Sequence, residues 1–522
     1  MKLSPSIPPF AREAVDLMRD TASRVLTAVN KAAKGYGVRS YDMAKVNSRT
    51  QDWVPPMTSG NQEIREAGDL IRSRSYDLVR SAAIAARIRQ AVITRVVGRG
   101  ITPQCDDPEW MAAWNEWQGD CYTGDRMNWA GVQTTLVGSM FDGGGAFARR
   151  RGRKADDVGL SGRPLSVPLQ LQLYEYDQID HTKDFPTPSG GKIIQGIEYD
   201  AIGRPIQVHF FQCHPSDFWY STESFVSTPV PFSDLAHLYR DDRPGDSRGT
   251  PWLRPVARRL RDLDKYADYE LTRKRQESCT VAVVIGGDDN TDMDDEENRI
   301  TPSIRNMRGQ IESKMNPGQY LYTEGGRDIK FHSPSGSQGY DAYIKAVLHE
   351  IAAGMSLPYY SISSDLSQCS YSSARIGDVE ARAWVRPLQE QVLIPKLCDP
   401  VARWFTDAAY ACGRLPRRDY AIRWILPAIE EHNRDEAAKA DREEIRCGLT
   451  SLPDVQLRRG YEPAALLKRI ADSNKALDDA GVVLDSDPRN TTTSGSAQAS
   501  SDANTPPADP NNPDQNPIAQ AA

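Results

Sequence analysis

Three neighbouring side chains have the types needed for a metal site. His209, Cys213 and His214 lie within one six-residue stretch, and imidazole and thiolate are common ligands of zinc. Apolar residues alternate with His209 in the run 206–211, so a strand there places His209 on the face opposite the apolar one. No carboxylate or second cysteine is placed to complete the ligand set. We therefore interpret these residues as surface side chains and predict no metal or cofactor.

The acidic run from Asp288 to Glu297 is a second candidate for cation chemistry, with seven carboxylates in ten residues. A calcium-binding EF-hand loop needs glycine at its sixth position and glutamate at its twelfth. Counted from Asp288, these positions hold Met293 and Arg299, so the pattern fails. The run is then either a solvated loop or an acidic docking surface. The residues assigned to such a surface are Asp292, Asp294, Asp295, Glu296 and Glu297.

A basic stripe follows the segment 251–278, in which apolar residues recur every three or four positions as in a helix. Such a stripe has the chemistry to contact phosphate. Aspartates interleave with it, so ion pairs within the helix or between subunits are the favoured interpretation. The basic residues are Arg254, Arg258, Arg261 and Lys265, and the aspartates are Asp262, Asp264 and Asp268.

Trp110, Trp114, Trp117 and Cys121 follow one another at spacings of four, three and four residues, so they share one helix face. Asp107 before Pro108 is a strong helix start, because proline at the first helical position loses no needed N–H group. An aromatic face of this kind is either a buried stripe or a platform on which bases stack. We favour the buried stripe.

No motif for enzymatic chemistry accompanies these groups. The chain lacks the phosphate-binding pattern G-x-x-x-x-G-K-[ST], the zinc-protease pattern H-E-x-x-H and the nucleophile elbow G-x-S-x-G. Its seven histidines are scattered singly. We predict that the protein is not an enzyme.

Composition narrows the class of protein further. The 522 residues suffice for more than one domain. A formal net charge of −7 argues against a protein that grips DNA through lysine and arginine, although DNA can slide past an acidic surface. No apolar run is long enough to cross a bilayer, and the first residues lack the apolar core of a signal peptide. The eight cysteines contain no C-x-x-C pair, which favours reduced thiols in a cytosol.

The periodicities predict an α+β protein. Helices are expected over 10–34, 63–97 and from Asp107, and another from Asp125 to the flexible Asp142–Gly145. Residues 165–235 are expected to be β, with a half-buried strand in which Leu169, Leu171 and Leu173 alternate with polar residues, and a hairpin formed by 193–200 and 206–211.

In the second half, the helix over 251–278 is followed by a small α/β module, with strands over 281–285, 319–323 and 328–332 and a short helix from Thr301. A helix from Tyr340 ends at Leu357–Pro358. The polar loop 361–373 leads to a helical tract over 374–412, which Pro387, Pro395 and Pro400 kink or divide. Helical patterns resume over 427–448 and 453–480, and the polar tail is expected to be disordered.

In eight segments taken in order, the chain resembles phage portal proteins of the lambda family, the rings at one vertex of a tailed-phage capsid. No single segment is diagnostic, but together they span about residues 60–410. They are AVITRVVGRGI (91–101), VGSMFDGGGAFARR (137–150), LQLYEYDQID (171–180), QGIEYDAIGRP (195–205), HLYRDDRPGDSRGTPWLRPV (237–256), NPGQYLY (316–322), IAAGMSLPYYSISSDLSQCSYSSAR (351–375) and VLIPKLCDPVARWF (392–405).

The resemblance implies the portal fold: an α/β wing, a helical stem, an inserted α/β clip, a long kinked helix and a helical crown. By position, an N-terminal arm and wing occupy 1–250, stem helices 251–278 and 339–356, and the clip 279–338. The tunnel loop is 357–373, the long kinked wing helix 374–412, the crown 413–480 and the disordered tail 481–522. Tunnel-loop residues placed at the DNA channel are Ser364, Asp365, Gln368, Tyr371 and Arg375.

The function that the resemblance implies is a dodecameric ring through which double-stranded DNA is packaged and ejected. Expected partners are other copies of the chain, the terminase large subunit docked at the clip, the major capsid or scaffold protein and the head-completion (connector) proteins, with no membrane. The expected location is the portal vertex of the virion, after assembly in the bacterial host cytoplasm. The alternatives are a packaging-associated DNA enzyme, such as a nuclease, and another structural head or tail component.

Overall fold

The computed structural model describes most of the chain from residue 57 to residue 484. Described are 48, 51–52, 54–55, 57–124, 126–154, 156–159, 162–217, 226–285, 319–321, 328–331, 339–367, 369–428, 433–482 and 484, with side chains omitted for 276–285, 319–321 and 328–331. The chain divides into two compact units, Met1–Ser59 and Gly60–Ala522, and all elements below belong to the second. The helix expected over 10–34, the short helix from Thr301 and the tail from 485 onward lie outside the described residues.

The first helical region is two helices rather than the single one expected over 63–97. Helix α2 (Gly60–Ser81) and helix α3 (Ala83–Val96) are separated by Ala82, whose backbone is extended (φ −97°, ψ 117°). Helix α4 (Pro108–Trp117) begins where predicted, with the Asp107 carboxylate accepting from the first backbone N–H groups. Helix α5 (Trp129–Gly143) begins later than expected, with the side chain of Asn128 as its cap.

The predicted tryptophan stripe is buried. Trp110, Trp114 and Trp117 are each at most 1% exposed, and Trp114 packs edge-on against Phe405 with ring centroids 5.0 Å apart. The Trp110 indole N–H donates to Thr406 Oγ1 at 3.0 Å. Burial raises the pKa of the Cys121 thiol to about 12. These contacts exclude the base-stacking interpretation, because no face of the stripe reaches solvent.

Two antiparallel sheets follow. In the first, β2 (Gly145–Gly152) lies between β3 (Leu169–Glu175) and β9 (Leu235–Tyr239). The second has the order β4 (Phe185–Pro186), β5 (Lys192–Ile194), β6 (Ile197–Tyr199), β7 (Pro205–Phe211) and β8 (Ser227–Pro231). The predicted hairpin is present as β6–β7. Short 3₁₀ turns η2 (Tyr176–Gln178), η3 (Pro215–Asp217) and η5 (Phe232–Asp234) connect these strands.

Two residues predicted to face solvent are buried. Gln170 in β3 is 1% exposed, because its amide donates to the backbone carbonyls of Asp120 and Tyr122. His209 in β7 is 7% exposed, because the turn after Asp180 covers its face of the sheet and brings Lys183 Nζ to 3.1 Å from its Nδ1. The prediction of a surface histidine was therefore wrong. Burial and Lys183 lower the pKa of His209.

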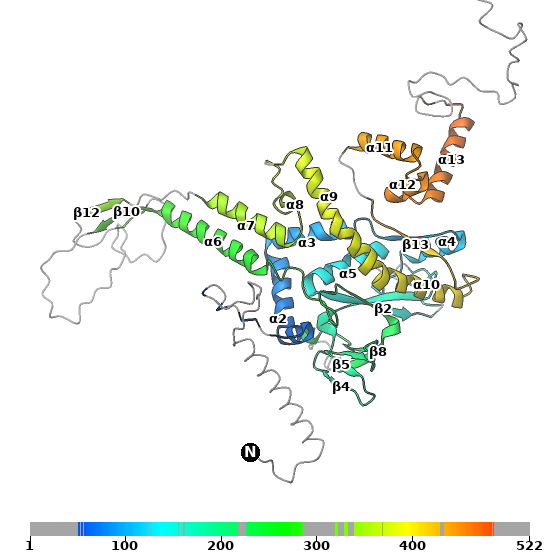
Figure 1. Ribbon diagram of the computed structural model, residues 1–522, viewed down its shortest axis with the longest axis horizontal. Helices are drawn as coiled ribbons and strands as arrows, with labels where there is room; N and C mark the ends of the chain where they lie inside the picture. Colours follow the sequence, from blue (N-terminus) through cyan, green and yellow to red (C-terminus); the bar gives the residue numbers. More distant parts are fainter. Residues whose placement is uncertain are drawn as a thin grey trace, which may run out of the picture. The chain divides into compact units, whose positions relative to one another are not determined.

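Helices α6 (Ala257–Cys279) and α7 (Tyr340–Gly354) contact each other, as Figure 1 shows, and β10 (Thr280–Ile285) follows α6 directly. Residues 251–256, expected to be helical, form consecutive turns. Strand β10 pairs in parallel with β11 (Gln319–Leu321) and antiparallel with β12 (Asp328–Phe331). The predicted strands of the inserted module are therefore present.

A nearly continuous helical run follows. After the short helix α8 (Tyr359–Ser363) come α9 (Tyr371–Leu388), a π-helical segment (Gln389–Cys398) and α10 (Asp399–Ala411). The prolines expected to kink or divide this tract coincide with the π-helical segment and its two ends. Such widened turns accommodate residues that cannot complete the ordinary helical hydrogen-bond pattern.

The range 413–480, predicted to be helical, begins instead with a strand. Strand β13 (Ile422–Ile425) pairs antiparallel with β1 (Thr102–Cys105), far away in the sequence. Helices α11 (Arg434–Arg446), α12 (Leu452–Arg458) and α13 (Pro463–Asp479) follow. No helix among the described residues is both long and apolar enough to cross a membrane.

The end of α5, the start of β2 and the approach to α6 meet at two glycines. Gly144 has a left-handed backbone (φ +91°), and a Cβ built on it would lie 2.6 Å from the carbonyl oxygen of Gly249. A Cβ on Gly249 would lie 2.2 Å from the carbonyl oxygen of Gly144. Neither position accepts a side chain, because in each case the clashing atom belongs to the backbone.

A buried polar network surrounds this contact. The Gly249 N–H donates to Tyr176 Oη at 3.1 Å, and that hydroxyl lies 2.8 Å from His237 Nε2. The Arg248 guanidinium lies over the Tyr176 ring, 4.6 Å from its centroid, and donates to the Tyr176 carbonyl. Burial lowers the pKa of Arg248 to about 10. Burial, Lys396 and Arg248 together hold the pKa of His237 well below its usual value.

We predict that Gly144→Ala lowers the free energy of unfolding by about 2 kcal/mol or more, because the new methyl group needs both a strained backbone and a displaced chain. Gly152→Ala, at the far end of the strand that follows Gly144, is the matched control, since no atom lies within 4 Å of a Cβ built at that position. Urea or thermal unfolding of the two variants measures the difference. Equal stability of the two would contradict the tight contact.

We also predict that the protein loses stability as the pH falls below about 6.5. His237 is neutral when folded, and its pKa is depressed there, so the unfolded chain takes up a proton that the folded chain does not. One such group costs up to about 1.4 kcal/mol per pH unit. Unfolding between pH 7.5 and 5 should show a smaller slope in His237→Gln than in the wild type. An unchanged slope in His237→Gln would contradict this prediction.

Candidate functional site

The α6–α7 pair is held together by apolar and aromatic contacts. Leu260 and Leu263 of α6 and Ile351 of α7 are buried. Further along, the rings of Tyr266 and Tyr340 stack with centroids 5.6 Å apart. An ion pair between Arg259 and Glu350, 3.0 Å apart, also joins the two helices.

Three of the four predicted basic residues lie together on the outer face of α6. Arg258, Arg261 and Lys265 are exposed and lie opposite the face that carries the buried leucines. None of the three makes an ion pair with any residue that the structure describes. The expected pairs within the helix are therefore not formed by these side chains, and pairs between copies stay a prediction. Arg254 lies before α6 and is paired with Asp242 at 2.9 Å.

The segment 357–373 is shorter as a loop than predicted. Helix α8 occupies its first part, and α9 begins at Tyr371 with Ser370 as the capping residue, which leaves 364–370 between them. Ser364 ends α8 in the left-handed region (φ 58°). Asp365 accepts from the Ser367 N–H at 2.9 Å, and hydrogen bonds from Ser367 lower the pKa of its carboxyl.

The remaining tunnel-loop residues are arranged as follows. Tyr371 is exposed at the start of α9, and Arg375 lies 3.8 Å from Glu436 of α11. Gln368 lies outside the described residues. So do all five acidic docking residues, Asp292, Asp294, Asp295, Glu296 and Glu297.

Helix α8 is held from both sides by side chains that the sequence did not single out. Arg95 of α3 donates to Ser361 Oγ at 2.7 Å and lies 3.3 Å from Asp378 of α9. The Tyr360 hydroxyl donates to the same Asp378 carboxylate at 2.7 Å. An open pocket of about 390 Å³ lies here, and Arg87, Arg95, Ser364 and Leu366 are among its lining residues. The base of the loop is therefore fixed to the N-terminal helices.

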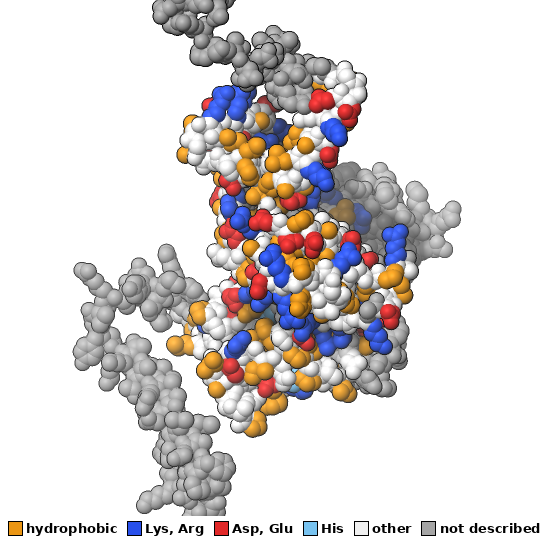
Figure 2. Space-filling view, turned by 90° about the vertical axis from the view of Figure 1, so that its right-hand side faces the viewer, with side chains coloured by type: hydrophobic (Ala, Val, Ile, Leu, Met, Phe, Trp, Pro, Cys, Tyr) orange, Lys and Arg blue, Asp and Glu red, His pale blue; other side chains and the backbone are white. Residues whose placement is uncertain are grey.

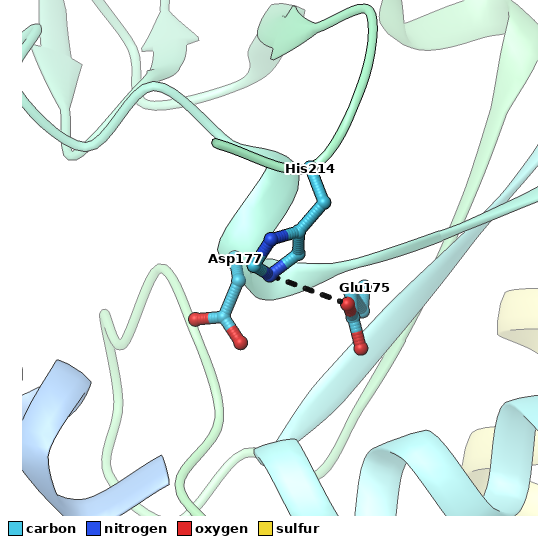
Figure 3. A group of neighbouring side chains, drawn as sticks. All are labelled: Glu175, Asp177 and His214. Carbon is cyan, nitrogen blue, oxygen red and sulfur yellow. Dashed lines mark ion pairs between the residues drawn. The ribbon is translucent and has the colours of Figure 1, made fainter. Parts of the chain in front are cut away.

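One side-chain group has the geometry of a cation site. Glu175, at the end of β3, Asp177 in η2 and His214, just before η3, each offer a ligand atom, and these atoms lie within 4.8 Å of one another. Figure 3 shows the three side chains, with His214 Nε2 3.6 Å from Glu175 Oε1. Burial and the neighbouring Asp177 raise the pKa of Glu175. His214 was a candidate from its sequence neighbourhood, but both carboxylates were missed, because they are more than 30 residues away along the chain.

His209 and His214, considered together as metal ligands in the sequence analysis and then interpreted as surface side chains, do not lie in one site. His209 is engaged with Lys183 and lies 3.7 Å from Glu198, whereas His214 faces Glu175. Cys213 is a free thiol. Carboxylates that the sequence could not locate are thus present, with Glu198 beside His209 and Glu175 beside His214.

The model of one protein family, phage portal protein of the lambda family, matches residues 47–389 of the chain. The chain belongs to this family. The match runs from before α2 to the start of the π-helical segment and includes the α6–α7 pair and the loop 364–370. The family named from the eight sequence segments is therefore confirmed.

Similar proteins include a probable portal protein of the Halomonas phage phiHAP-1, which is 21% identical over 470 residues, covering 83% of this chain and 86% of that protein. Solved structures that resemble the chain include the virion of a native gene transfer agent particle (14% identity, TM-score 0.39). Another is the neck of the empty particle, computed with C6 symmetry (13% identity, TM-score 0.41). Each match covers 74% of this chain and 94% of the other.

Proposed function

We propose that this protein assembles into a homo-oligomeric ring, dodecameric by its family resemblance, at one vertex of a phage capsid, and that double-stranded DNA enters and leaves through it. The observation that carries the proposal is the family match over residues 47–389. The ring performs no catalysis and needs no cofactor, in keeping with the structural role of the family. Assembly takes place in the host cytoplasm, and the finished ring belongs to the virion.

The described elements fit this scheme in order. We assign 1–250 to the arm and wing, α6 and α7 to the stem, the β10–β12 region to the clip and 364–370 to the tunnel loop. The tract α9–π–α10 is the kinked wing helix, and α11–α13 form the crown. We assign strand β13 to the wing rather than the crown, and its pairing with β1 supports this assignment.

Exposed apolar side chains support association with further copies of the chain. On α9 and the preceding loop, Leu366, Ile376 and Val379 are 63%, 69% and 58% exposed. Clusters of exposed apolar residues mark protein contacts more often than free surface.

The crown helices bury very little within one copy. No residue of α11 is buried, and Pro463 is the one buried residue of α13. On α13, Leu467 and Ile470 are 53% and 45% exposed. Figure 2 shows hydrophobic side chains gathered on the uppermost described part of the molecule, which α11–α13 form in Figure 1. Helices of this length are stabilised chiefly by packing, so a neighbouring copy is the occupant that we propose for this surface.

Partners are assigned by region. The terminase large subunit docks at the clip, where the acidic run 288–297 offers a charged surface, and the head-completion proteins follow it there. The major capsid or scaffold protein surrounds the ring. DNA passes the loop 364–370, whose polar side chains form a soft constriction, and the acidity of the chain limits adhesion to phosphate. The alternative functions are a nuclease and another structural head or tail component. The mass and shape of the assembled protein distinguish both from a portal ring.

We predict that the purified protein forms particles of about 700 kDa with a central hole, since twelve chains of 58.1 kDa have that mass. Mass photometry and negative-stain imaging measure mass and shape. The double variant Leu467→Asp and Ile470→Asp should reduce the fraction of rings, because it places charge on the proposed crown contact. The control is Lys468→Asp, on the polar face of the same helix. A wild-type chain that stays monomeric at high concentration, with and without capsid proteins, would sink the ring proposal.

We predict that Arg261 and Lys265 of one α6 helix form ion pairs with Asp264 and Asp268 of the α6 helix in a neighbouring copy. Reversing charge in Arg261→Glu and Lys265→Glu, or in Asp264→Lys and Asp268→Lys, should weaken the ring, and combining the four changes should restore it. Each exposed pair contributes about 0.2–1 kcal/mol, repeated around the ring. Ring dissociation against salt concentration measures the effect. Intact rings that hold DNA less tightly would show instead that this face meets phosphate.

A further inference from the structure

We propose that the outer face of α9 of one copy docks on the pocket between α3 and α8 of the next copy, with Glu380 paired to Arg87. This inference rests on the proposed ring, and it names two surfaces of the chain that meet in it. The pocket, the charges on its walls and the side chains on the opposite side of α9 carry it.

The pocket lies where α8 and α9 both pack against α3 (Figure 1). Its volume of about 390 Å³ falls within the range of about 300–1,000 Å³ that is usual for ligand pockets, so it has room for more than one side chain. One wall is a single face of α3, on which Arg87, Ala91 and Arg95 follow one another at intervals of four residues. Ser361 of α8 and Leu366 of the loop 364–370 also line it.

One positive charge in the pocket has no counter-charge within the copy. Arg95 is balanced by the Asp378 carboxylate, 3.3 Å away. Arg87 donates through Nε to the Ser361 carbonyl oxygen at 3.0 Å, and its guanidinium makes no ion pair with any residue that the structure describes. Leu366, which is 63% exposed, adds an apolar part to the lining. A fitting occupant therefore carries one carboxylate together with apolar side chains.

The outer face of α9 carries this combination. Ile376, Val379 and Glu380 follow one another at spacings of three and four residues from Ile376, which places them on one face of the helix. Ile376 and Val379 are 69% and 58% exposed. Glu380 is also exposed, and within the described part of the chain its carboxylate has no ion-pair partner. This face thus offers the carboxylate and the apolar groups that the pocket lacks.

The two surfaces lie on different sides of α9 and cannot meet within one copy. Asp378 points toward α3, because it is bound to Arg95, whereas Ile376 and Glu380, each two residues from it, lie about 200° around the helix. A ring of identical chains needs two different, complementary surfaces on each chain, because its contacts run head to tail. A second copy is favoured over a DNA phosphate as the occupant, since a phosphate would leave Glu380 and its apolar neighbours without a partner.

The test is charge reversal at the proposed pair, Arg87→Glu and Glu380→Arg, in the full-length protein. Each single variant should raise the protein concentration at which half of the chains are in rings at least about fivefold, because like charges then meet at every contact. The double variant restores the pair in the opposite sense and should return this concentration to within about twofold of the wild-type value. Arg80→Glu, at an exposed arginine of α2 outside the pocket, is the matched control and should assemble as the wild type does.

Mass photometry over a series of protein concentrations measures the fraction of chains in rings, and thermal unfolding shows which variants are folded. Because Glu380 is an exposed residue, Glu380→Arg tests the contact even if Arg87→Glu is unstable. Wild-type rings that Glu380→Arg leaves unchanged would overturn the contact while the ring proposal stands. Weakening by both single variants without recovery in the double variant would also overturn it.

Two further outcomes are distinct from these. Rings that stay intact in Arg87→Glu but hold DNA less tightly would show that the pocket takes a phosphate group and not a neighbouring copy. A wild-type chain that forms no ring would refute the proposed function, and this contact with it.

Discussion

The contact between the backbones of Gly144 and Gly249 is the constraint on which the surrounding sheet and the start of helix α6 depend. At this point α5 ends, β2 begins, and the chain that enters α6 passes within van der Waals distance. Tyr176 closes the contact by accepting from the Gly249 N–H, while Arg248 covers its ring. Because both guanidinium and imidazole are buried here, the network tolerates neither added volume nor a further charge. The direction in which the chain leaves strand β2 and enters helix α6 is set by this small region.

A second constraint ties the two halves of the chain together. The tryptophans of α4 pack against Phe405 of α10, and β1 pairs with β13 close to the same core. The Gln389 amide donates to the Val96 carbonyl at 2.7 Å, which joins the π-helical segment to the end of α3. The tract after the loop 364–370 is thus part of the same core as α3, α4 and α5, although it follows α6, α7 and the β10–β12 sheet in sequence. This explains why an inserted module can be accommodated without dividing the core.

Features governed by neighbouring residues were predictable from the sequence. The Asp107 cap, the tryptophan stripe, the β6–β7 hairpin and the glycine end of α5 each depend on a few adjacent side chains. The family was also recognisable, because its segments occur in order.

Features governed by distant contacts were not predictable. Gln170 and His209 follow an alternating pattern that predicts exposure. Each is nevertheless buried, because a segment from elsewhere in the chain covers it. Nothing in the run of β13 indicates its pairing with β1. At the candidate cation site, His214 attracted attention, but Glu175 and Asp177 join it only when β3 and the segment after β7 come together. Similarly, the clamp of Arg95 on Ser361 joins residues 266 positions apart.

The π-helical segment affects how the helical tract formed by α9, this segment and α10 can bend. From Tyr371 to Ala411 the backbone stays helical, so these residues form one rod about 60 Å long at the usual rise. Its first end borders the loop 364–370, and its last part carries Phe405 among the tryptophans. A rod transmits displacement along its axis, but a π-helical turn holds an extra residue and bends more easily than the turns on either side. In this chain the π-helical segment is itself packed in the core, since Leu393, Leu397 and Cys398 are fully buried and Gln389 is bonded to Val96, so this packing restrains the bend.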